Sequence, residues 1–107
     1  MRGESMADLV PLSYFALHVG RSFRLRDAGG TALVLSLAQP LPPVTKAGGA
    51  VLPGRREPFE LMFTGPLTPI LNQQIYWFEA DGLDPIEIFI VPIGPYEGGM
   101  GYQAVFN

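Results

Sequence analysis

The sequence predicts a small all-β domain, an antiparallel barrel or sandwich of about six strands with one short N-terminal helix. Two observations support this fold class. Thirteen glycines and eleven prolines divide the 107 residues into short segments, and none of these segments has a long 3.6-residue hydrophobic period. Alternating apolar and polar residues recur at short intervals with turn-forming residues between them, which is typical of small barrels and sandwiches.

The helix is expected near the N-terminus, where the sequence offers a start and a stop signal. Ser13 is a suitable N-cap for a helix over residues 14–19, and Gly20 is a suitable end. His18 would then lie in the last turn, where the helix dipole favours an imidazole. We therefore interpret this single histidine as a helix-end residue and not as a catalytic base.

The strands follow from two-residue periodicity bounded by turns. Phe23 and Leu25 alternate with arginines, and the Asp-Ala-Gly-Gly sequence after them predicts a hairpin with the next strand. Farther along the chain, Phe59, Leu61 and Phe63 share one face of a strand, which we expect to be its inward face. The expected strands cover residues 22–27, 31–39, 58–65, 74–81, 86–94 and 100–107.

Two of these strands are apolar on both faces. In the first, Ile75 and Trp77 oppose Tyr76 and Phe78; in the second, residues 86–94, isoleucines oppose a phenylalanine, a valine and an isoleucine. A half-exposed antiparallel strand normally alternates apolar with polar residues. The second apolar face of each strand is therefore expected to be covered by the helix and a long loop, or by another subunit.

Two proline features refine this outline. Residues 40–56 contain four prolines and three glycines, so we expect a long connection there and no central strand. A loop of this length in a small domain is either mobile or functional. Pro92 cannot donate a hydrogen bond to a β-ladder, so it marks an edge position or a bulge in the strand over residues 86–94.

Four residues are candidate partner contacts. Arg55 and Arg56 can bind an acidic partner through forked hydrogen bonds, or they protect the hydrophobic strand that follows from aggregation. Trp77, the single tryptophan, is either a core residue, the alternative we favour, or an interface anchor, because tryptophan is enriched at binding hot spots. Phe89 is the aromatic residue of the second two-sided strand.

The composition narrows the functional classes. The net charge of −3 and the lack of a basic cluster disfavour nucleic-acid binding. The chain has one histidine and no cysteine, so a histidine- and thiolate-based metal site is excluded. The carboxylates Asp81, Asp84 and Glu87 are the candidates for an enzyme, yet Asp, Gly and Pro are also ordinary turn residues. We therefore expect no enzymatic activity, no catalytic residue, no metal and no cofactor.

Charged residues make up 16% of the chain, against about 25% in a typical soluble domain. This shortage fits a protein that covers part of its surface with a partner, although a compact domain with Gly- and Pro-rich loops would show it too. We expect a flexible tail over residues 1–8 and a single domain over residues 9–107. No segment has the length and apolarity of a signal peptide or a membrane span, so we expect synthesis in the cytoplasm without Sec export.

Several segments also carry a family resemblance. They occur in the order HVGRSFRL, PFELMFTGP, YWFE, IFIVPIG and YQAVFN, from residue 18 to residue 107. Together they resemble a small bacterial family of uncharacterised domains, catalogued as domain of unknown function 6916, over residues 9–107. The chain departs from the family pattern at Ala80, where the family often has a histidine.

The resemblance implies no established activity, but it implies a context. Genes of the family often lie beside those of phage tail-collar-like proteins of the microcystin-dependent type. The resemblance therefore implies a non-enzymatic structural or interaction module in a phage-tail-like or extracellular fibre assembly, which binds a tail-collar-like protein or associates with itself. The final location would then be an extracellular or virion-like assembly. The alternative is a small-ligand-binding β-barrel whose cavity is lined by Trp77, Phe78 and Phe89.

Overall fold

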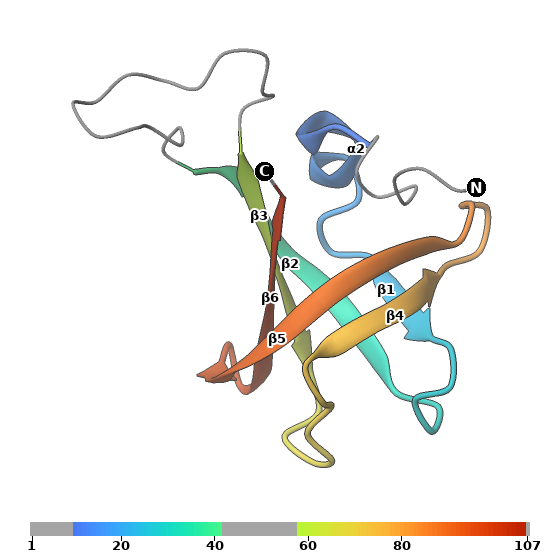
Figure 1. Ribbon diagram of the computed structural model, residues 1–107, viewed down its shortest axis with the longest axis vertical. Coiled ribbons are helices and arrows are strands. Elements are labelled where there is room, and N and C mark those ends of the chain that lie inside the picture. Colours follow the sequence, from blue (N-terminus) through green and yellow to red (C-terminus); the bar gives the residue numbers. More distant parts are fainter. Residues whose placement is uncertain (1–9, 42–57, 107) are drawn as a thin grey trace.

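Each segment with two-residue apolar periodicity is a β-strand in the computed structural model, which describes residues 10–41 and 58–106 (Figure 1). All neighbouring strands are antiparallel, and they close into a barrel in the order β1-β2-β3-β6-β5-β4. The all-β prediction is confirmed. The closed ring of strands shows that the fold is a barrel and not a sandwich. The elements are α2 (Leu12–Ala16), β1 (Ser22–Leu25), β2 (Ala32–Pro40), β3 (Phe59–Gly65), β4 (Gln74–Glu79), β5 (Ile86–Tyr96) and β6 (Gly99–Phe106).

The helix differs from the prediction in its bounds and its cap. It begins after Pro11, which is the N-cap with extended backbone angles and no side-chain cap bond, so Ser13 lies inside the helix. Proline suits a helix start because the missing N–H would have no helical partner there. The helix ends at Ala16, and the His18 N–H bonds the carbonyl of Phe15 in a tighter turn. The His18 ring therefore lies beyond the helix, with its centroid 4.8 Å from that of Tyr14.

The predicted hairpin between the first two strands is present. Phe23 pairs with Leu33 in an antiparallel register, and the Leu25 N–H bonds the carbonyl of Thr31 at 3.1 Å. The connecting turn contains Asp27 and two glycines with positive φ, a conformation that glycine adopts without steric cost. The Asp-Ala-Gly-Gly sequence is thus the local cause of this turn.

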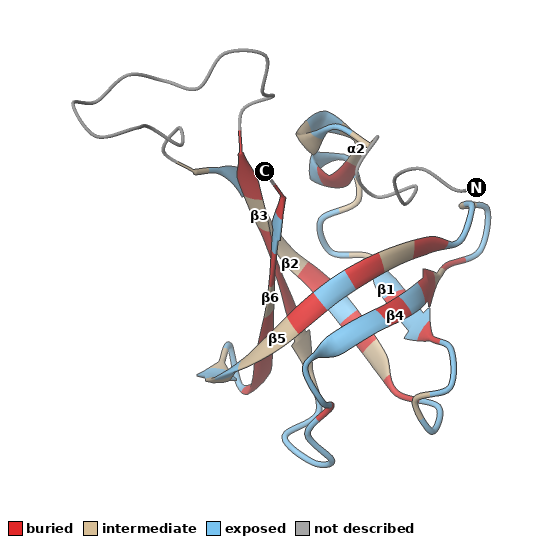
Figure 2. Cartoon of the chain, in the orientation of Figure 1, coloured by how far each residue is buried: buried red, intermediate tan, exposed pale blue. Residues whose placement is uncertain are grey.

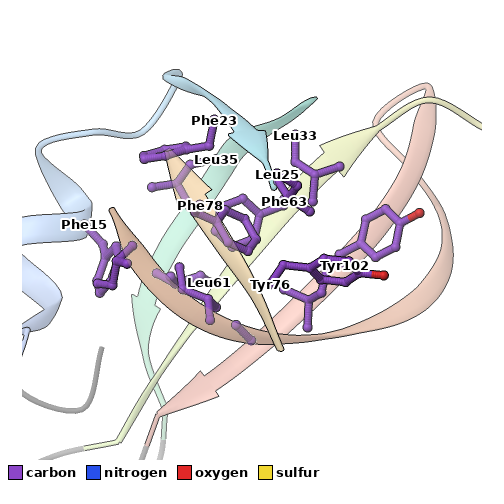
Figure 3. Close-up of a cluster of buried hydrophobic side chains, with 14 of the residues drawn as sticks. Phe15, Phe23, Leu25, Leu33, Leu35, Leu61, Phe63, Tyr76, Phe78 and Tyr102 are labelled. Atoms are coloured by element: carbon purple, nitrogen blue, oxygen red, sulfur yellow. The ribbon is translucent and has the colours of Figure 1, made fainter. Parts of the chain in front are cut away.

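The barrel interior is filled by aromatic and branched side chains from all six strands (Figure 3). The ring centroids of Phe63 and Phe78 lie 4.9 Å apart, and that of Phe23 lies 6.2 Å from that of Phe78. Leu61 is fully buried beside them. The face that the sequence assigned to the inside of β3 is therefore the inside of the barrel.

Both ends of the barrel are closed by short segments of the chain. At one end, Phe15 of α2 packs its ring against Phe59 and Phe106, at centroid distances of 6.0 and 5.5 Å. At the other end, residues 66–73 cross from β3 to β4 (Figure 1). Leu71 of this connection is buried, and its N–H donates to the Tyr102 hydroxyl at 2.9 Å.

The prediction of an irregularity at Pro92 is confirmed as a bulge. The pairing of β5 with β6 shifts between Pro92 and Gly94, so the register runs from Val91–Gln103 and Pro92–Tyr102 to Gly94–Gly101. The edge position is present as well, because the pairing of β5 with β4 ends at Gln74–Ile90 and Pro92 lies beyond it. Proline has no N–H to donate to a ladder, and an unpaired side or a bulge tolerates that lack.

A candidate interaction surface on strands β4 and β5

The pleat of β4 and β5 places one set of apolar residues inside the barrel and another on its outer surface. Ile75 and Trp77 on β4 are 58% and 37% exposed, and Phe89 and Ile93 on β5 are 48% and 49% exposed. We call these four residues the β4–β5 strip. Tyr76, Phe78, Ile88 and Ile90, which alternate with the strip residues, are buried, so the strip belongs to the outer apolar face of two strands that are apolar on both sides.

The pairing of the two strands makes the strip continuous. Ile75 lies directly opposite Phe89, and Trp77 lies opposite Glu87, one pair farther along. Side chains that are directly or diagonally opposite on one face of an antiparallel pair are in reach of each other. Figure 2 shows the exposed segments of β4 and β5 next to each other on the same side of the barrel. Half-buried Val91 connects Phe89 to Ile93 along β5.

Trp77 contacts Arg26, which is itself paired with Glu79. The Arg26 guanidinium carbon lies 5.0 Å from the Trp77 ring centroid, a cation–π contact worth about 0.5–1 kcal/mol at an exposed site. The Arg26 Nε donates to a carboxylate oxygen of Glu79 at 2.7 Å, and the Arg26 backbone N–H bonds the carbonyl of Trp77 at 3.0 Å. The indole therefore has a restricted orientation before any partner arrives.

The charges around the strip lie at one end of it. Besides the Arg26–Glu79 pair, Arg24 forms an ion pair with Asp81 at 3.2 Å. Both partners of that second pair are well exposed, so it contributes little to stability. No charged residue occurs in the segments 61–78 and 88–96. The four strip residues are thus uncharged, and the charges at the Trp77 end are Glu87, directly opposite Trp77, and the two ion pairs.

The outer face across β3 and β6 has a different character. The two carboxylate oxygens of Glu60 accept hydrogen bonds from the side-chain amides of Gln39 and Gln103, at 2.6 Å each. Nearby, burial raises the pKa of the Tyr96 phenol above its usual value, and the negative charges of Glu97 and Glu60 add to the rise. On this polar face Glu60 has side-chain hydrogen-bond partners, whereas the four strip residues carry a single polar group, the indole N–H of Trp77.

The structure brings two of the four predicted contact residues together. Trp77 and Phe89 are both exposed and lie diagonally on paired strands. The interpretation of Trp77 as a core residue is wrong, because its indole lies outside the barrel. Arg55 and Arg56, like the expected tail over residues 1–8, lie outside the described residues.

The cavity lining expected for a ligand-binding barrel is not assembled. Phe78 points into the filled interior and is fully buried, whereas Trp77 and Phe89 are on the exterior. The three aromatic side chains therefore cannot line one cavity. A small pocket does lie beside α2, bordered by Tyr14 and, at the start of β5, by Ile86, but none of the three aromatics contributes to it.

The carboxylates considered for catalysis are spread over the β4–β5 turn and the outer face. Asp81 lies in the turn and pairs with Arg24, and Glu87 lies opposite Trp77. Among residues 10–41 and 58–106, no group of three or more His, Cys, Asp or Glu side chains could hold a metal ion. Within the same ranges, no helix is long and apolar enough to cross a membrane.

Sequence reasoning missed Arg26 and Glu79, the residues that restrict Trp77. The alternation in β1 placed Arg26 on the same face as Arg24. It did not reveal that β1 pairs with β4, because β4 follows β1 in the chain only after two intervening strands. The exposure of Ile75 and Ile93 had a detectable signal, since both belong to the second apolar face of their strands.

Comparison with protein families gives one match. The model of a family described as Domain of unknown function (DUF6916) matches residues 10–106. Comparisons with curated proteins and with solved structures returned no match. The matched range includes α2, the six strands and every residue of the strip.

Proposed function

The chain belongs to the DUF6916 family, whose function is unknown, and we propose from its exposed residues that the domain is a non-enzymatic interaction module. In this role the domain is an accessory component of a phage-tail-like or extracellular fibre assembly. It holds its place there by protein–protein contact through the β4–β5 strip. The partner is a tail-collar-like protein or another copy of the domain.

The observation that carries this proposal is the exposed strip with its fixed tryptophan. Contiguous exposed apolar surface rimmed by polar residues marks an interaction site more often than a random surface. Tryptophan and arginine are the residue types most enriched at binding hot spots, and Arg26 stacks on Trp77 here. Because Glu79 fixes Arg26, binding would immobilise few additional rotamers, which favours affinity.

The filled interior supports a protein partner over a small ligand. Rings from β1, β3 and β4 meet inside the barrel, and both ends are closed by Phe15 and Leu71. A small-molecule site normally needs a concave apolar cavity. The surplus apolar surface of this chain lies instead on a convex exterior, where a second protein surface can cover it.

Co-purification from the native host tests the proposal. The tagged domain is expected to retain a tail-collar-like protein of the host, and Ile75→Glu is expected to lower the recovery of that protein at least about 10-fold, because a buried charge without a partner is costly. Val34→Glu is the matched control, because Val34 is a 38% exposed residue on β2, on the opposite side of the ring. Asp81→Ala and Asp84→Ala should leave recovery unchanged.

Two results would count against this role. Equal recovery for Ile75→Glu and for the unmodified chain would contradict contact through the strip. Zero recovery for the wild-type domain would rule out the tail-collar-like protein as the partner and leave only another copy of the domain. A loss of recovery caused by Asp81→Ala or Asp84→Ala in a folded protein would place the contact at the β4–β5 turn instead of the strip.

A further inference from the structure

The occupant of the β4–β5 strip can be argued from its size, its charge and its composition. We propose that a second copy of this chain covers it, with the strips of the two copies packed face to face about a two-fold axis. This inference rests on the proposed role of the strip as a protein contact. It goes further by making a dimer, and not the single chain, the unit that enters the assembly.

The apolar area is appropriate for such a dimer. An aromatic side chain carries about 150–250 Å² of surface, so the exposed parts of Trp77, Phe89, Ile75 and Ile93 sum to on the order of 400 Å². A standard interface buries about 800 Å² per partner, somewhat more than half of it apolar. The strip together with half-buried Val91 supplies the apolar core of an interface of that size.

The charges allow two copies to approach each other. In a two-fold interface each surface meets its own equivalent, so an unpaired charge within the strip would face or approach the same charge on the other copy. The four strip residues are uncharged, and Glu87 is the charged residue directly opposite Trp77 on the same face. At its bordering end, the Arg26 cation is neutralised by Glu79 and the Arg24 cation by Asp81. The like-charge repulsion that remains comes from Glu87, so the two-fold contact has to place the two Glu87 carboxylates at its rim, where solvent screens them.

The composition favours a second copy over an unrelated partner. Interfaces between unlike proteins that also exist separately are about as polar as the rest of the surface, whereas homodimer interfaces are more apolar. The four members of the strip are apolar except for the indole N–H of Trp77. The outer faces of β4 and β5 also form a sheet surface, and two such surfaces pack with interdigitating side chains about 10 Å apart.

Sedimentation velocity of the purified full-length domain tests this inference without any other protein. The wild-type chain is expected to sediment as two copies of the 11.6 kDa chain at micromolar concentration. Ile75→Glu is expected to sediment as a single chain, with a dimer dissociation constant raised at least 100-fold. Val34→Glu, on the opposite strand β2, should remain a dimer. If Ile75→Glu does not fold, Phe89→Gln, a milder change on β5, replaces it as the test. This variant should also weaken the dimer.

Trp77 gives a second, independent measurement. As the single tryptophan, it reports on the strip directly. Dilution of the wild-type protein should shift its emission maximum to longer wavelength and increase quenching by iodide, over the same concentration range in which the mass falls to one chain. A wild-type protein that is monomeric at high micromolar concentration would overturn the inference, as would a dimer that is unaffected by both strip variants.

The two proposals fail in different ways. If the wild-type domain is a monomer and still retains the tail-collar-like protein through the strip, the dimer is wrong and the proposed function stands. If the domain is a strip-dependent dimer that recovers no tail-collar-like protein, the dimer stands and the role in that assembly is wrong.

Discussion

At the scale of single residues, adjacent positions in β4 have opposite roles. Phe78 is fully buried and its ring packs against those of Phe23 and Phe63. Trp77, one position earlier, is partly exposed on the exterior and touches Arg26. The alternation of a β-strand separates the two, so hydrophobicity alone does not indicate which of them stabilises the fold.

Alanine substitutions at these two positions should therefore differ in cost. Phe78→Ala is expected to lower the free energy of unfolding by about 3–5 kcal/mol, since it leaves a cavity in the barrel interior. Trp77→Ala is expected to cost about 1 kcal/mol in the monomer, mainly through the lost contact with Arg26. Urea unfolding followed by circular dichroism measures both. Equal costs, measured below the concentration of self-association, would contradict the assigned faces.

At the scale of elements, the β5–β6 hairpin depends on its two-residue turn. Tyr96 pairs with Gly99, and the two residues between them, Glu97 and Gly98, have φ of 50° and 81°. Positive φ at both positions is the type I′ geometry, which matches the twist of the flanking strands. The turn thus sets the register with which β6 enters the barrel between β5 and β3.

Substitutions in this turn should change stability in opposite directions. Gly98→Ala is expected to destabilise the domain by about 1–2 kcal/mol, because a side chain disfavours the left-handed conformation. Glu97→Asn is expected to be neutral or to stabilise it by less than about 1 kcal/mol, because asparagine tolerates that conformation better than glutamate. Thermal unfolding of the two variants and the wild type checks the signs. A stabilising Gly98→Ala would show that the turn has another geometry.

At the scale of the whole molecule, the strand junctions of the closed barrel differ in length. Strands β3 and β6 pair continuously from Phe59–Phe106 to Gly65–Met100. Strands β1 and β4, which close the ring, pair only at Arg24–Glu79 and Leu25–Phe78. The exposed ion pairs beside that junction contribute little to stability. The β1–β4 junction is therefore the weakest part of the ring.

Amide hydrogen exchange should reveal this difference. The β3–β6 junction is expected to be the most protected, with opening governed by global unfolding, and the amides of β1 and β4 that bond across their junction should exchange earlier, through local opening. Exchange measured by NMR on the wild-type domain tests the order. Arg26→Ala should further reduce protection at the β1–β4 junction and leave that at the β3–β6 junction unchanged. Equal protection at both junctions would contradict a weak point of closure.

The sequence by itself determined the strands, because a two-residue apolar period and Gly- or Pro-containing turns are local properties. It identified the inner face of β3 and the bulge at Pro92 for the same reason. It misplaced the helix start, since Ser13 and Pro11 both offer valid local starts and only packing of Phe15 against Phe59 and Phe106 selects one.

The tertiary structure alone decided which apolar face is inside. In β4 and β5 both faces are apolar, so periodicity cannot separate core from surface; closure of the ring does this by enclosing Phe78 and leaving Trp77 outside. The pairing of β1 with β4 also brings Arg26 onto Trp77, a contact between residues separated by two intervening strands in the chain. Long-range pairing depends on the sum of all packing energies, which no local pattern encodes, and here it creates the candidate site.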